Sequence, residues 1–209
     1  MDIIKPLMEL SKIRKIFHSE ADFQFALAWE IQKAYPNAKV RLEYCPAGIE
    51  PVMHIDILVI IDEYWYPIEL KYKTFGCTKI HEGEIYKLKH HGAQDMGRYD
   101  FLNDVQRIEH LSKKMVNFKK GYSILLTNDP AYWNDSGRID TIYHEFRLID
   151  GLCKTGEMKW ASHASEGSIK GRETSIVLEN NYFIEWQKYC EIDSERSGIF
   201  KYLMLSLEL

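Results

Sequence analysis

Three charged residues stand inside two apolar, strand-like segments. Asp56 lies within residues 53–61, and Glu69 and Lys71 lie within residues 64–73. Both segments are rich in β-branched and aromatic residues, which is typical of strands. Carboxylates can bind a divalent cation, and an amine beside them can hold a water molecule or offset negative charge. The residue types therefore suggest chemistry at a metal ion.

The connection between the two segments decides how these side chains meet. A two-residue turn at Asp62 and Glu63 would set Asp56 directly opposite Glu69. A four-residue loop would instead set Asp56 opposite Lys71. Because a shift of two residues preserves the face of a strand, both alternatives bring the three charged side chains to one face.

Two neighbouring carboxylates are costly in a half-buried sheet unless a positive charge neutralises them. A divalent cation such as Mg²⁺ would do so, since it prefers oxygen ligands. The alternative is a surface ladder in which Lys71 bridges Asp56 and Glu69. Glu-x-Lys triplets are common on strands, so the triplet alone does not distinguish the two.

An acidic residue at the start of a predicted helix favours the metal site. Ser19 and Asp22 form a weak capping box that starts the helix. The helix carries one apolar stripe, formed by Phe23, Leu27 and Ile31. Glu20 falls within this stripe, where a carboxylate is out of place unless it points at the same cation. The alternative is that Glu20 only interacts favourably with the helix dipole.

Periodicity predicts the remaining elements. The first 17 residues contain a short helix. Further elements follow in chain order: strands over 39–44, 53–61 and 64–73, a helix through 102–115, and a strand over 122–127. The last strand–helix–strand succession predicts a parallel crossover. The order is therefore αβββαβ.

The C-terminal third carries a weaker signal. We expect strands over 141–148, 175–178 and 200–207, with 151–171 mostly loop. No linker marks a second domain, so residues 1–209 are expected to form one domain. Residues 129–209 would extend or flank its sheet as a β-rich addition.

In this order the residues resemble the PD-(D/E)xK nuclease superfamily, which has the restriction-endonuclease-like fold. The resemblance covers about residues 18–128 and rests on these positions: Glu20, Asp56, Glu69, Leu70 and Lys71. Ile55 stands where the proline of the family name would be, a position without chemistry. The resemblance implies an α/β fold with a mixed central sheet flanked by helices.

The resemblance also implies an activity, namely phosphodiester hydrolysis by a Mg²⁺-dependent endonuclease in which Mn²⁺ can substitute. Asp56 and Glu69 would ligate the metal together with the Leu70 main-chain carbonyl. Glu20 would hold the ion, directly or through water. Lys71 would orient or deprotonate the attacking water and offset charge in the transition state.

Basic residues near this site are candidate nucleic-acid contacts. The long segment 74–93 follows the Glu-x-Lys strand and carries three of them: Lys87, Lys89 and His90. They would contact the backbone of DNA, or form only a solvated hairpin. Arg107 on the second helix is a candidate phosphate contact, although a solvent-exposed pair with Asp104 is an alternative.

Composition limits the class of protein. Lys plus Arg is 27 and Asp plus Glu is 31, a net charge of −4 that excludes histone-like coating of nucleic acid. Four widely spaced cysteines lack zinc spacing and suggest reduced thiols. With no apolar leader or membrane-length run, we expect a cytoplasmic protein.

Three hypotheses remain open from the sequence. The first is the nuclease, with DNA preferred over RNA as partner and a homodimer if both strands are cut together. The second is a catalytically silent nucleic-acid-binding or protein-interaction module of the same fold. The third is a small α/β protein in which the charged triad is accidental.

Overall fold

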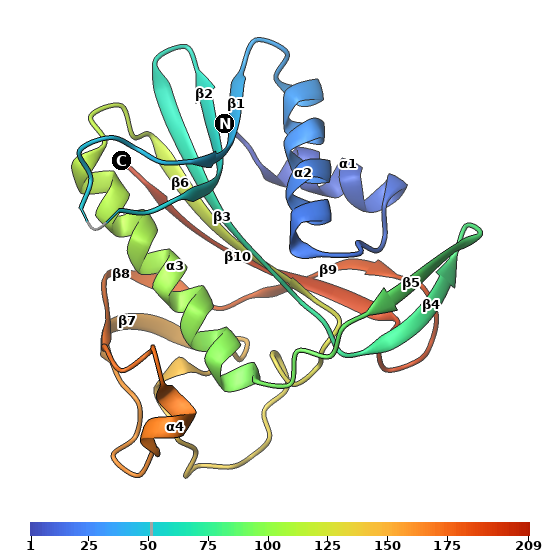
Figure 1. Ribbon diagram of the computed structural model, residues 1–209, viewed down its shortest axis with the longest axis vertical. Helices are drawn as coiled ribbons and strands as arrows, with labels where there is room; N and C mark the ends of the chain where they lie inside the picture. The colour runs from blue at the N-terminus through green and yellow to red at the C-terminus, as the bar shows by residue number, and fades with distance from the viewer. Residues whose placement is uncertain (51) are drawn as a thin grey trace.

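The computed structural model describes residues 1–50 and 52–209 and shows a mixed α/β protein (Figure 1). The N-terminal part contains, in chain order, α1 (Ile4–Ile13), α2 (Glu20–Ala34), β1 (Lys39–Tyr44), β2 (Ile55–Ile61), β3 (Tyr64–Lys73), β4 (Cys77–His81), β5 (Glu84–Leu88), α3 (Gln94–Lys114) and β6 (Lys120–Thr127). The remainder contains a 3₁₀ turn (His144–Phe146), β7 (Cys153–Met158), α4 (Glu166–Ile169), β8 (Ile176–Phe183), β9 (Trp186–Glu191) and β10 (Ile199–Glu208).

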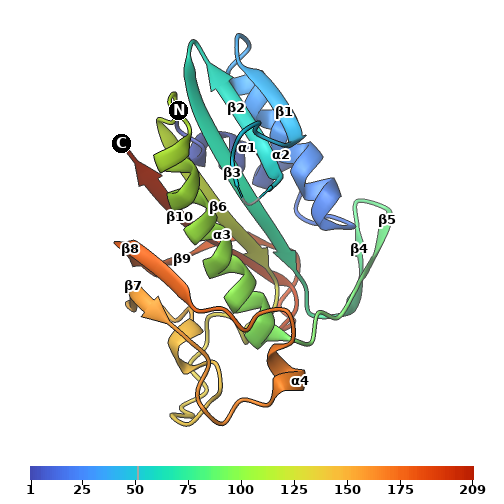
Figure 2. The ribbon, with the colours of Figure 1, turned by 60° about the vertical axis from the view of Figure 1, so that its left-hand side comes forward.

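A mixed six-stranded sheet forms the centre, in the order β1-β2-β3-β6-β10-β9. β3 and β6 are parallel, whereas the other neighbouring strands are antiparallel. The chain passes from β3 to β6 through the β4–β5 hairpin and α3, so the predicted parallel crossover is confirmed. Helices α1 and α2 cover one face of the sheet and α3 lies against the other (Figure 2).

The β2–β3 hairpin fixes the register of the charged residues. Ile61 pairs directly with Tyr64, so residues 62–63 form the two-residue turn. The first turn residue is an aspartate with φ of 55°, a left-handed conformation that aspartate tolerates better than most residues. The four-residue loop is therefore wrong. The ladder ends at the pair of Ile57 and Ile68, and its register continued by one residue matches Asp56 with Glu69.

The predicted start of α2 is confirmed. Ser19 is the N-cap, and its side chain accepts a hydrogen bond of 3.1 Å from the Asp22 N–H. The Asp22 carboxylate accepts from the His18 N–H at 2.9 Å and forms a two-pronged ion pair with Arg14. These contacts join the first turn of α2 to the segment that connects it with α1, and this turn carries Glu20.

The C-terminal third differs from expectation in three places. The predicted strand over 141–148 is wrong, because this segment forms a turn and the 3₁₀ element. Its apolar pattern arises because Phe146 and Leu148 fill a core beside α3. The predicted loop over 151–171 contains β7, and β9 was not predicted. The strands β9 and β10 do extend the central sheet, as expected.

Two other expectations concern the chain as a whole. All four cysteines have free thiols. None of the helices within 1–50 and 52–209 is long and apolar enough to cross a bilayer.

Candidate active site

The candidate site lies where β2 and β3 separate. The two strands are paired only as far as Ile57 and Ile68, and residues 69–73 of β3 continue beside β6 alone. On the side facing β2, the main-chain groups of this continuation have no strand partner among the described residues. Buried main-chain N–H groups require acceptors, so this fork needs side chains to supply them.

Two carboxylates supply those acceptors. Asp56 Oδ2 accepts from the Leu70 N–H, and Glu20 Oε2 accepts from the Tyr72 N–H, each at 2.6 Å. Because the N–H and C=O of one strand residue point to the same side, the Leu70 carbonyl also faces the fork. It accepts a 3.3 Å hydrogen bond from Lys71 Nζ. The fork thus gathers two carboxylates, a main-chain carbonyl outside the β2–β3 ladder and an ammonium group.

The charged pair on β3 contacts α3. Lys71 Nζ lies 2.5 Å from Asp104 Oδ2, and Glu69 Oε1 lies 3.1 Å from Arg107 Nη2. Arg107 Nη1 is a further 3.5 Å from Asp104 Oδ1, and Nη2 also donates to the His54 carbonyl. Four charged side chains from one strand and one helix therefore alternate in sign between the sheet and α3.

The interpretation of Asp104 as part of a solvated face is wrong. Its side chain packs against the sheet, and the residue is 3% exposed. The sequence pattern predicted a helix that buries a single apolar stripe and exposes the opposite side. In the structure α3 packs on two sides, with Ile108 and Leu111 in one apolar cluster and Leu102 and Val105 in another. A polar row opposite an apolar stripe is then buried as well.

Burial and mutual repulsion raise the pKa of the carboxyl groups. Burial raises the pKa of Asp56, and the charge of Glu20 raises it further. The pKa of Glu69, which is 1% exposed, is raised well above its ordinary value by burial and by Asp104. Burial raises the pKa of Asp104 to about 6, although Lys71 stabilises its charged form. The cluster contains four carboxyl groups, of Glu20, Asp56, Glu69 and Asp104, but only two cationic side chains, of Lys71 and Arg107.

The pKa of Lys71 is raised as well, but for a different reason. Burial alone lowers its pKa, but the charges of Asp104, Glu20 and Asp56 outweigh burial and raise it above the ordinary value. The amine is therefore an ammonium group at neutral pH. In this state it can donate hydrogen bonds and offset charge, but it cannot accept a proton.

The donor set suits a hard divalent cation. Glu69 Oε1 is buried and has no hydrogen-bond partner of good geometry, and Asp56 stands opposite it. In the part of the chain that the structure describes, no group of three or more His, Cys, Asp or Glu side chains converges on a metal position. Mg²⁺ commonly uses only one or two carboxylates, with water and substrate oxygens completing its shell. Arg107 must turn away from Glu69 before that carboxylate can serve.

A cavity of about 570 Å³ gives access to the site. It lies between α3 and the segment before β2, and its lining includes His54, Asp56, Asn103, Gln106, Arg107 and His110. Six of the eight lining residues are polar or charged, and Arg107 is the one arginine or lysine among them. Three of these residues were not predicted from the sequence, namely Asn103, Gln106 and His110. They are spaced along one side of α3 as residues i, i+3 and i+7.

The other predicted nucleic-acid contacts lie elsewhere. Lys87, Lys89 and His90 are exposed on β5 and the segment after it. They belong to the β4–β5 hairpin, which projects from the body of the molecule (Figure 1). Arg107 is the one proposed contact that shares the cavity with Asp56. The structure therefore brings together Glu20, Asp56, Glu69, Leu70, Lys71 and Arg107.

Comparisons of the chain with models of protein families, with curated proteins and with solved structures find no match.

Proposed function

We propose that this protein is a metal-dependent nuclease with a restriction-endonuclease-like core, which hydrolyses phosphodiester bonds in DNA. The proposal is supported above all by the strand fork. There, Asp56 and Glu20 occupy the unpaired edge of β3 while Glu69 and Lys71 project beside them toward α3. Carboxylates at a fork, with an ammonium group and the Leu70 carbonyl outside the β2–β3 ladder, suit phosphoryl transfer at a cation.

Each residue has a distinct role in this proposal. Asp56, Glu69 and the Leu70 carbonyl would hold Mg²⁺ or Mn²⁺, and Glu20 would add negative charge beside the Tyr72 N–H. A divalent cation bound there polarises a phosphoryl oxygen and lowers the pKa of a bound water. Lys71 orients the attacking water and offsets charge on the phosphoryl group, because its raised pKa keeps it protonated.

Arg107 gives the cavity its phosphate contact. Its guanidinium group lies between Glu69 and Asp104, at the wall that Asp56 shares. An incoming phosphate offers the same bidentate geometry as a carboxylate, so Arg107 can exchange Glu69 for the substrate. That exchange would release the Glu69 carboxylate at the moment when DNA arrives.

One observation favours the second candidate, a catalytically silent binding module. Glu69 and Asp104 are already paired with Arg107 and Lys71, so half of the cluster is neutralised without a metal. A module of this kind would bind DNA through the cavity and cut nothing. The argument against it is that four carboxyl groups gather at the fork and only two cationic side chains, of Lys71 and Arg107, face them.

The test is cleavage of plasmid, linear duplex, single-stranded DNA and RNA with Mg²⁺, Mn²⁺ or EDTA. We expect metal-dependent cutting of DNA that falls at least about 100-fold in Lys71→Ala and in Glu69→Gln, the scale of losing a positioned charge or ligand. Glu69→Gln keeps the side-chain shape and removes a buried charge, so it should fold. Lys114→Ala, at the exposed end of α3, is the matched control.

Two outcomes would contradict the proposal. Cutting that persists in EDTA or in Glu69→Gln would place the activity elsewhere or in a contaminant. Tight DNA binding without any cutting, by a protein that also fails to bind Mn²⁺, would support the silent module instead.

A further inference from the structure

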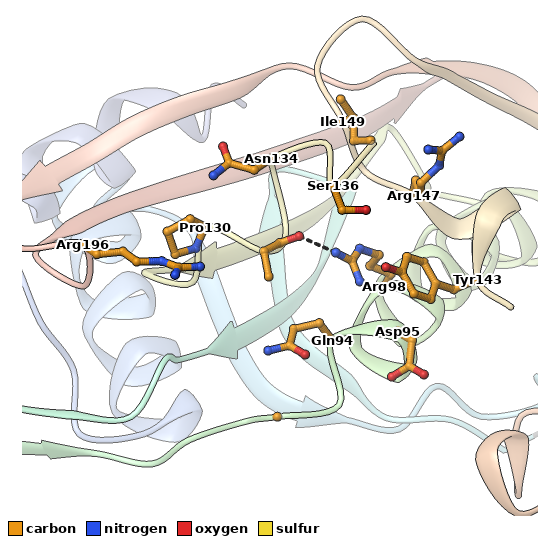
Figure 3. A pocket seen from close by; sticks show the side chains of 12 residues that line it. Gln94, Asp95, Arg98, Pro130, Asn134, Ser136, Tyr143, Arg147, Ile149 and Arg196 are labelled. Atoms are coloured by element: carbon orange, nitrogen blue, oxygen red, sulfur yellow. Dashed lines mark hydrogen bonds between the residues drawn. The ribbon is translucent and has the colours of Figure 1, made fainter. Parts of the chain in front are cut away.

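A second cavity, of about 500 Å³, opens at the N-terminal end of α3 (Figure 3). It lies between the first turn of the helix and the segments that follow β6. Three arginines from three parts of the chain line it, namely Arg98, Arg147 and Arg196. Lys71 and the carboxylates of the candidate active site are not among its lining residues.

Arg98 carries a buried positive charge without an anionic partner. The residue is 6% exposed, and its guanidinium group lies over the rings of Tyr132 and Tyr143 at 5.3 and 4.8 Å. Nη2 donates to the Ala131 carbonyl, the contact drawn in Figure 3. Nε is buried without an acceptor. Among the described residues, no carboxylate lies within ion-pair distance of Arg98, whereas other arginines of the chain do form ion pairs.

A buried arginine of this kind is costly unless an anion reaches it. Burial lowers the pKa of Arg98, but a guanidinium group remains charged in proteins. The two nearby carboxylates, of Asp129 and Asp95, accept hydrogen bonds from other groups. Asp129 accepts from the Gln94 side chain at 2.8 Å and from the Ala131 N–H at 3.0 Å. Asp95, which also lines the cavity, accepts from the Met96 N–H at 2.9 Å.

The two other arginines are also available for a ligand. Arg147 Nη1 is 3.7 Å from Asp135 Oδ1, a long contact, and its Nε is buried without a hydrogen-bond partner. Arg196 is exposed, and its guanidinium group lies 5.9 Å from the Phe75 ring. Neither is held in a close ion pair, so both can turn toward an anion in the cavity.

The helix adds a further attraction for negative charge. α3 is 21 residues long, and its N-cap residue, Ala93, has no side chain that could accept from the first turn. The Met96 N–H of the first turn donates to Asp95, so the helix contributes chiefly its dipole, which favours anions, phosphate among them. The helix end and the arginines are independent observations that point to the same ligand charge.

We propose that this cavity binds a phosphomonoester, with Arg98 and Arg147 as its charged contacts and Arg196 closing over the group. Arginine and a helix N-terminus match the geometry of phosphate oxygens. A volume of about 500 Å³ is in the range of small-molecule sites and exceeds the need of an inorganic ion, which suits a nucleotide. The phosphate can belong to a free nucleotide or to the end of a nucleic-acid strand. The inference does not rest on the proposed nuclease activity.

The first test is calorimetric titration with deoxyadenosine monophosphate and with deoxyadenosine, in EDTA so that no cleavage occurs. We expect the nucleotide to bind at least tenfold more tightly than the nucleoside. Arg147→Gln and Arg196→Gln should each weaken nucleotide binding about tenfold, the scale of one charge-assisted hydrogen bond. Arg41→Gln, on exposed β1, should leave the dissociation constant unchanged.

The second test identifies the source of the phosphate, by comparing a 5′-phosphorylated oligonucleotide with its 5′-hydroxyl form in the same titration. Preference for the phosphorylated strand would assign the cavity to strand ends. Binding of the free nucleotide without such a preference would assign it to nucleotides. Equal affinity for nucleotide and nucleoside, or wild-type affinity in both Arg147→Gln and Arg196→Gln, would overturn the proposal. Arg98 is left unchanged in these tests because its burial makes it a residue of the core as well.

Discussion

The carboxylate of Asp56 makes a structural hydrogen bond and also has a proposed role in binding a metal ion. One oxygen accepts from the Leu70 N–H and so ends the pairing of β2 with β3. Asp56 also lines the cavity through which a cation would reach it. An asparagine in its place separates the two functions, because an amide oxygen can still accept from Leu70 but is a poorer ligand without negative charge.

We therefore expect Asp56→Asn to lose Mn²⁺ binding by more than tenfold while keeping its fold. Burial raises the pKa of Asp56, so its ionised form is disfavoured in the folded protein. Replacing the charge with a neutral amide should leave the free energy of unfolding unchanged or slightly raised. Calorimetric Mn²⁺ titration and urea unfolding measure the two effects. Asp140→Asn, at an exposed position, is the control, and wild-type Mn²⁺ affinity in Asp56→Asn would remove Asp56 as a ligand.

Lys154 offers a pH-dependent test away from the site. Burial and the charge of Arg147 lower its pKa to about 8, and its Nζ donates to the Glu145 carbonyl at 2.7 Å. Between this value and the ordinary lysine pKa, the unfolded chain binds more protons than the folded one. The free energy of unfolding therefore rises with pH across this interval.

Lys154→Met should abolish that rise. We expect the stability of the wild type, relative to this variant, to increase by about 2 kcal/mol between pH 7.5 and 9.5. Urea unfolding at several pH values measures the difference, with the exposed Lys170→Met as control. Parallel stability profiles for wild type and Lys154→Met would show that the folded protein does not depress this lysine.

At the scale of single elements, α2 depends on its N-cap. Ser19→Ala removes the acceptor for the Asp22 N–H and should lower the free energy of unfolding by about 1 kcal/mol. Ser165 precedes α4 but makes no capping hydrogen bond, so Ser165→Ala is a matched control expected within about 0.5 kcal/mol of wild type. Thermal or urea unfolding compares them. Equal losses in both variants would contradict a specific cap at Ser19.

The elements that the sequence predicted are those whose signal is local. The stripe of α2, the capping serine, the alternation of β1 and the β-branched and aromatic residues of β2 and β3 all lie within short windows, and these elements are present in the structure. The two-residue turn was one of two open alternatives, and the pairing of Ile61 with Tyr64 decides it. The elements that were missed depend on distant partners. β9 is an edge strand whose residues alternate little, and it exists because β10 offers a free edge.

The same distinction applies to the candidate site. Glu20 and Asp56 were found because a carboxylate in an apolar pattern is conspicuous, and the structure brings both to the fork. A solvent-exposed pair of Asp104 with Arg107 was one of two alternatives, because no local pattern shows that Asp104 packs against Lys71 of β3. Arg98 could not be recognised either. Its burial comes from Tyr132 and Tyr143, which lie more than thirty positions away.

On the scale of the whole molecule, the C-terminal third surrounds α3. Glu109 of the helix accepts from the N–H groups of Glu179 and Asn180 at 2.9 Å, and from the Tyr182 hydroxyl at 3.0 Å. These contacts hold β8 against the side of α3 that faces away from the sheet. The helix is thereby clamped between two layers, which keeps Arg107 and Asp104 of the same helix in a fixed position over β3.

The β4–β5 hairpin contacts the connection between β9 and β10 as well as following β3 in the chain. Lys79 of β4 is 5% exposed, and its Nζ lies 2.8 Å from Asp193 Oδ2 and 2.6 Å from Glu195 Oε2. Asp193 and Glu195 belong to the connection between β9 and β10. A desolvated lysine between two carboxylates is worth more than an exposed surface pair, so this contact should restrain the hairpin.

Lys79→Met should release that restraint without unfolding the sheet. We expect amide hydrogen exchange to accelerate about tenfold in residues 77–88 and 192–198, which corresponds to a local loss of about 1.4 kcal/mol. Exchange in α2 and β2 should not change, because neither contacts the lysine. Lys87→Met is the matched control on the same hairpin, since Lys87 is exposed. If Lys79→Met left both segments as protected as in the wild type, the covalent connections of the hairpin to β3 and α3 would be enough to hold it. Its basic residues would then be presented to a partner without help from the C-terminal strands.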